Sequence, residues 1–61
     1  MKYGELKKIL KRNGCYQSGE YTNHEKWFSP ITGKSFPVPR HNSQEAAPKT
    51  VNKILKDAGL K

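Results

Sequence analysis

The stretch HEKWFSPITGKSFPVP, residues 24–39, decides the fold of this chain. Its first part, residues 24–29, carries the aromatic pair that favours a β-strand. The Pro-Ile-Thr-Gly run at residues 30–33 predicts a hairpin turn, because proline suits the first central position of a turn and glycine its end. Residues 35–38 then form the returning strand. Pro37 and Pro39 cannot donate hydrogen bonds to a neighbouring strand, so this strand either lies at the edge of the sheet or ends at these prolines.

Amphipathic helices flank the hairpin on both sides. Apolar residues recur at helical spacing over residues 2–13, and an Asn-Gly pair stops this helix, since glycine takes the left-handed conformation without penalty. A second helix begins at Pro48, whose missing N–H costs nothing at the first helical position, and Gly59 caps its end. Residues 15–20 predict a third, weaker strand.

The order α-β-β-β-α predicts one α+β domain over residues 1–61. A three-stranded antiparallel sheet and two helices make a two-layer sandwich with both helices on one face of the sheet. The other face is left to solvent or to a ligand. A chain this short buries about 60% of its unfolded surface, so its core is small.

The charge of the chain points to a polyanionic partner. Twelve Lys and Arg stand against five Asp and Glu, which gives a net charge of +7. Such an excess on a small body attracts nucleic acid first, an acidic protein second and an anionic membrane third.

The compartment follows from cysteine usage and hydropathy. Cys15 is the one cysteine, so no intramolecular disulfide can form, and a reducing environment is favoured. The first ten residues, MKYGELKKIL, lack the apolar core of a signal peptide, and no apolar run reaches transmembrane length. We therefore expect a cytoplasmic protein with no membrane partner.

His24 is the first candidate for chemistry, because histidine is the side chain that exchanges protons most readily near neutral pH. Side chains alternate along a strand, so His24 and Lys26 share one face while Glu25 and Trp27 share the other. Trp27 carries the largest apolar side chain and is expected under the helices. His24 then lies on the open face or at its rim.

Metal and nucleotide chemistry find little support. His24, His41 and Cys15 match no metal-ligand spacing, so no metal is expected. No glycine-rich phosphate loop is present, and we expect no cofactor. Cys15 is interpreted as a small buried hydrophobic residue rather than a nucleophile.

Cleavage of RNA is the reaction that needs least from a protein, since the 2′-hydroxyl of the substrate can be the nucleophile. A histidine can act as general acid or base, and lysines can stabilise charge on the phosphate. His24 with Lys26 meets this description. Two alternatives stay open at this point: a surface histidine without a catalytic task, and a basic surface that only binds.

The chain as a whole resembles the HicA toxins of type II toxin–antitoxin systems. The most specific pieces are TNHEKW (residues 22–27), FPVPRH (residues 36–41) and TVNKILKDAGL (residues 50–60). The resemblance implies a double-stranded-RNA-binding-type fold, an mRNA interferase activity that arrests growth, and a HicB antitoxin that covers the active histidine. It places that histidine at His24. Thr22 stands where the family usually has glycine.

The resemblance and the charge together suggest which residues contact RNA. Double-stranded-RNA-binding domains recognise shape and phosphates, which suits lysines. His41 is interpreted as a catalytic partner of His24, or else as a structural or phosphate-contacting residue of the loop. The candidate RNA-binding residues are Lys26, Lys7, Lys8, Lys11, Arg12, Arg40 and His41.

Two competing functions fit the same sequence. One is a non-catalytic RNA-binding module of the same fold. The other is a small basic protein that docks on an acidic partner. RNA cleavage without metal, lost on His24→Ala, would separate the nuclease from both.

Overall fold

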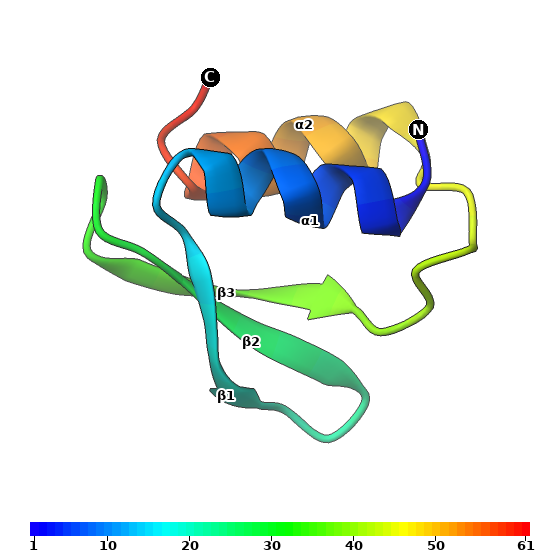
Figure 1. Cartoon of the computed structure of the whole chain (residues 1–61), viewed down its shortest axis with the longest axis horizontal. Helices are drawn as coiled ribbons and strands as arrows, with labels where there is room; N and C mark the ends of the chain where they lie inside the picture. Colours follow the sequence, from blue (N-terminus) through cyan, green and yellow to red (C-terminus); the bar gives the residue numbers. More distant parts are fainter.

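The computed structural model describes residues 1–61 and contains two helices and three strands in the predicted order (Figure 1). These elements are α1 (Tyr3–Arg12), β1 (Tyr16–Glu20), β2 (His24–Ser29), β3 (Lys34–Pro39) and α2 (Pro48–Asp57). The predicted α+β order is confirmed, and the element bounds differ from the predicted ones by at most one residue at each end. The second helix ends at Asp57, close to the Gly59 cap that the sequence predicts.

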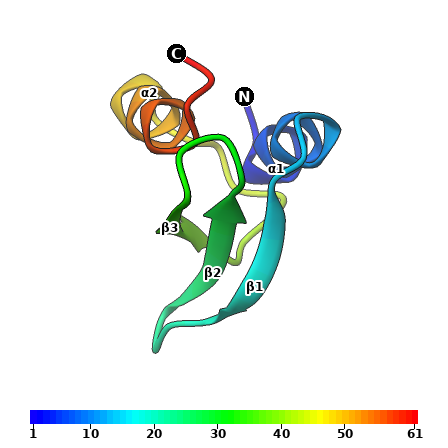
Figure 2. The same cartoon turned by 90° about the vertical axis from the view of Figure 1, so that its left-hand side faces the viewer.

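The sheet is antiparallel, with β2 between β1 and β3. Both helices cover the same face of the sheet, with α1 over the β1 side and α2 over the β3 side (Figure 2). β3 is an edge strand, where prolines are tolerated, and it continues through Pro39 rather than ending at residue 38. β1 carries a bulge between Gln17 and Gly19, which shifts its register against β2.

The core lies between the helices and the covered face of the sheet. Trp27 is 2% exposed and sits on that face, as predicted from the alternation along β2. The buried apolar side chains around it are Tyr3, Leu6, Leu10, Cys15, Phe36, Val38, Ala46, Ile54 and Ala58. Every layer of the fold contributes to this one cluster, so the sheet and both helices are held together.

The C-terminal end of α2 is fastened to the turn between β2 and β3. The hydroxyl of buried Ser29 donates a hydrogen bond to the Ala58 carbonyl (2.6 Å), and the Thr32 hydroxyl donates to the Asp57 carbonyl (3.1 Å). Gly59 has a φ of 81°, and a Cβ there would lie 2.8 Å from side chains of the turn. Glycine is therefore required both for the helix end and for the close approach.

α1 departs from the prediction at Lys7. This lysine was predicted to bind RNA, which requires an accessible side chain, yet it is only 6% exposed. It lies four residues after Tyr3 and three before Leu10, and this spacing places it within the stripe that faces the core. Its ammonium is satisfied there, because Nζ lies 3.0 Å from Glu25 Oε1 and donates a hydrogen bond to Asn42 Oδ1.

Candidate active site

His24 begins the central strand and is exposed. In the register between β2 and β3 it stands opposite Pro39, and Lys26 stands opposite Pro37. Side chains opposite one another in a sheet share a face, so these residues lie on the face opposite to Trp27, and at the edge strand β3 this face also borders α2. The expectation that His24 lies on the open face or at its rim is confirmed.

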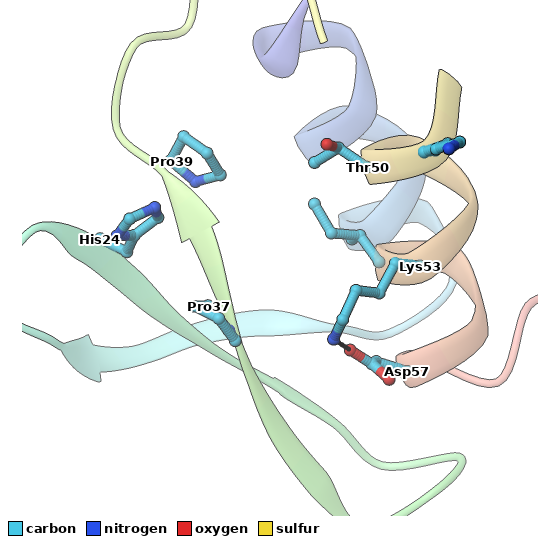
Figure 3. Close-up of a pocket in the computed structure, with 8 residues that line it drawn as sticks. His24, Pro37, Pro39, Thr50, Lys53 and Asp57 are labelled. Atoms are coloured by element: carbon cyan, nitrogen blue, oxygen red, sulfur yellow. Dashed lines mark hydrogen bonds and ion pairs between the residues drawn. The ribbon is translucent and has the colours of Figure 1, made fainter. Parts of the chain in front are cut away.

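A hollow of about 300 Å³ lies beside His24, between β3 and α2 (Figure 3). It is lined by His24, Pro37, Pro39, Lys49, Thr50, Lys53, Ile54 and Asp57. Figure 3 shows His24, Pro37 and Pro39 along one side, with Thr50, Lys53 and Asp57 of α2 across from them. The hollow therefore joins apolar proline rings, an imidazole and charged side chains in one space.

The charges around the hollow favour an anion. Lys49 and Lys53 stand against one carboxylate, Asp57. Lys53 Nζ lies 3.3 Å from Asp57 Oδ2, one helical turn away, and the lysine side chain is 76% exposed. An ion pair so open to water is weak. Lys53 can therefore exchange this partner for another anion at little cost.

The other side of β2 is held by a polar network. Trp27 Nε1 donates a hydrogen bond to Glu25 Oε1 (2.9 Å), and the Lys7 ammonium lies 3.0 Å from the same oxygen. Partial burial alone would raise the pKa of Glu25, but the hydrogen bonds from Trp27 and Lys7 and the positive charges of Lys7 and Arg40 lower it below its usual value. This network holds the side chain of Glu25, the residue directly after His24, in one position.

Arg40 fastens the turn that precedes His24. Its Nη2 donates to Glu20 Oε1 and to the Tyr21 carbonyl, both at 3.1 Å. The Tyr21 N–H in turn donates to the His24 carbonyl at 2.8 Å. Since no residue other than glycine has a positive φ, Thr22 occupies this turn without backbone strain. Arg40 thus acts on the backbone around His24.

The remaining predicted RNA-binding residues lie apart from the hollow. Lys26 is half-buried, with Nζ 6.0 Å from the centre of the Tyr21 ring. Lys8, Lys11 and Arg12 are exposed on α1, on the flank of the sheet away from α2 (Figure 2). His41 is exposed in the loop after β3. None of these residues, and neither Lys7 nor Arg40, lines the hollow.

Sequence reasoning missed the contribution of α2. Lys49, Lys53 and Asp57 are spaced by four residues, which places them on one flank of a helix. That spacing was a usable signal. It could not show which part of the sheet the flank would face.

The structure contains neither a metal-ligating cluster nor a membrane-spanning helix. No three His, Cys, Asp or Glu side chains come together in a group that could hold a metal ion. Cys15 is buried and free, as its interpretation as a small hydrophobic residue requires. No helix is long and apolar enough to cross a membrane.

The fold and the site together define a class of protein: a small basic α+β domain in which an exposed histidine lies at the edge of a cationic hollow. The family model described as the HicA toxin of bacterial toxin–antitoxin systems matches residues 3–60. The chain belongs to this HicA toxin family, so the resemblance read from the sequence is confirmed. Its role is that of a toxin, and an antitoxin is its implied partner. No curated protein and no solved structure gives a match.

Proposed function

We propose that this toxin is a metal-independent endoribonuclease that cleaves mRNA with His24 as its general acid or base. The observation that carries the proposal is the position of His24, exposed at the start of β2 and on the border of the hollow that also contains Lys49 and Lys53. An imidazole open to solvent, beside cations that favour a phosphate, has what proton transfer at a phosphodiester requires.

The chemistry is transesterification within the RNA strand. The 2′-oxygen attacks the neighbouring phosphorus, the bond from phosphorus to the 5′-oxygen breaks, and a 2′,3′-cyclic phosphate and a 5′-hydroxyl result. His24 either takes the proton from the 2′-hydroxyl or gives one to the leaving 5′-oxygen, and water exchanges the other proton. The nucleophile comes from the substrate, so the protein supplies proton transfer and charge stabilisation.

Attraction of RNA involves more of the surface than the hollow. Lys8, Lys11, Arg12 and Lys26 add to the positive field of a chain with a net charge of +7, which draws a polyanion toward the protein over a distance set by salt. We assign His41 no catalytic part, because it does not line the hollow.

The antitoxin in this proposal is a HicB-like protein with an acidic surface. One acidic partner that covers the hollow would neutralise Lys49 and Lys53 and block access to His24 in a single contact. A structure of the complex that leaves His24 open to solvent would contradict this part.

The test is cleavage of a single-stranded RNA by the purified toxin in the presence of EDTA. We expect cleavage by the wild type, products with 2′,3′-cyclic phosphate and 5′-hydroxyl ends, and no cleavage by His24→Ala. A non-catalytic RNA-binding module would bind the RNA and leave it intact.

A second experiment separates the toxin from a protein that only docks on an acidic partner. Expression without the antitoxin should arrest growth for the wild type and not for His24→Ala. Equal growth of both strains would contradict the nuclease.

A further inference from the structure

We propose that the hollow between β3 and α2 is the subsite for one RNA nucleotide, with Lys49 and Lys53 binding its phosphate and Pro37 and Pro39 contacting its sugar and base. This inference rests on the proposed nuclease function and adds the residues that hold the substrate. It moves the principal phosphate contacts from α1, where the sequence suggested them, to α2.

Geometry is the first support. His24 and the two lysines come from different elements, β2 and α2, and they meet at one hollow because the β2–β3 turn fastens the end of α2 to the sheet. A volume of about 300 Å³ is at the lower end of the range for small-molecule sites. It suits a single nucleotide and not a folded RNA element.

The lining is the second support. Pro37 and Pro39 give one side of the hollow an apolar surface, and the lysines give the other side positive charge. A nucleotide has the same division, with an apolar base face and an anionic phosphate. A hollow of lysines alone would fit any anion, whereas this lining also fits the rest of the nucleotide.

The ion pair of Lys53 with Asp57 is the third support. Asp57 holds the ammonium at the hollow with an N–O distance of 3.3 Å, in a pair exposed enough to be exchanged. A phosphate would replace the carboxylate as the partner of Lys53. Asp57 then opposes binding, so removing its charge should strengthen binding.

Salt-dependent binding to a 2′-O-methyl RNA oligonucleotide tests the subsite without cleavage, since this RNA lacks the nucleophile. We expect Lys49→Ala and Lys53→Ala each to weaken binding. Each should also reduce the magnitude of the slope of log binding constant against log salt concentration by about 0.7, the value of one phosphate contact on a single strand. Asp57→Asn should bind more tightly than the wild type.

Lys34→Ala is the matched control, because Lys34 is exposed at the far end of β3 and outside the hollow. It removes the same charge from the protein. If the two α2 variants bind no more weakly than Lys34→Ala, the subsite is overturned.

The nucleotide itself is probed by nuclear magnetic resonance with adenosine 3′-monophosphate and, separately, inorganic phosphate. We expect the nucleotide to perturb the His24 ring and the signals of Pro37 and Pro39 at a concentration several-fold lower than inorganic phosphate. Equal effects of the two probes would leave only a charged patch and overturn the nucleotide subsite.

Cleavage of unmodified RNA distinguishes failure of this inference from failure of the proposed function. If the subsite is correct, Lys49→Ala and Lys53→Ala raise KM more than they lower kcat. A wild type that binds as expected and does not cleave contradicts the nuclease and leaves the subsite. A wild type that cleaves, with α2 variants equal to Lys34→Ala in KM and in binding, contradicts the subsite and leaves the nuclease.

Discussion

The two sides of β2 differ sharply, although their residues alternate along six positions of the chain. On the covered side, Glu25 forms an ion pair with Lys7 of α1 and accepts a hydrogen bond from Trp27, and Ser29 donates a hydrogen bond to Ala58 at the end of α2. On the open side, the His24 side chain makes no hydrogen bond and borders a hollow. In the proposed function, the covered side of β2 therefore contributes to stability and the open side to catalysis.

The largest effect is expected at the centre of the covered side. Trp27→Ala should cost about 3–5 kcal/mol of unfolding free energy, because a large cavity replaces a side chain that is 2% exposed. That loss is enough to unfold much of so small a domain. Denaturant unfolding followed by circular dichroism measures it. A folded Trp27→Ala with unchanged stability would break the division between the two sides.

The next largest loss of stability is expected at Lys7, the buried lysine of the network with Glu25 and Trp27. Lys7→Met should lower the unfolding free energy by about 3 kcal/mol, because it leaves the Glu25 carboxylate without its ammonium partner. This value is the low end of the range for a broken buried ion pair, since 17% of the Glu25 side chain is exposed to water. The double variant Lys7→Met with Glu25→Gln should recover part of this loss. Lys11→Met, on the exposed part of α1, is the control and should change stability by less than about 0.5 kcal/mol.

The pH dependence of stability sharpens the same comparison. The pKa of Glu25 is lower in the folded state than its usual value of 4.5, so its contribution is complete above that pH and is lost as the pH falls through the folded-state pKa. In urea unfolding at several pH values, the free-energy difference between the wild type and Glu25→Gln should shrink below pH 4.5. A difference that stays constant down to acid pH would contradict the role of the charged carboxylate.

The order of elements could be predicted because each signal is local. The hairpin turn at residues 30–33, the helix start at Pro48 and the helix end at Gly59 depend on a few neighbouring residues each. Trp27 could be placed under the helices because alternation along a strand needs only the strand itself.

The environment of Lys7 and the hollow could not be predicted, because both depend on contacts between distant segments. Lys7 is satisfied by Asn42, which is 35 residues away, and a lysine in a helix gives no local sign of such a partner. The lining of the hollow requires the flank of α2 to face the edge of β3. That placement comes from the packing of Ser29 and Thr32 on the helix end.

The smallest effect on stability is expected on the open side of β2. His24→Ala removes an exposed side chain that makes no hydrogen bond, so unfolding free energy should change by less than about 0.5 kcal/mol. The same change should abolish cleavage of RNA. No other substitution proposed for this strand separates the two properties so completely.

The direct test is therefore one preparation of His24→Ala, measured for both thermal unfolding and RNA cleavage in EDTA beside the wild type. The account predicts superimposable circular dichroism and melting curves together with complete loss of cleavage. A folded His24→Ala that still cuts RNA would contradict the assignment of the catalyst, and an unfolded one would show that His24 belongs to the structure.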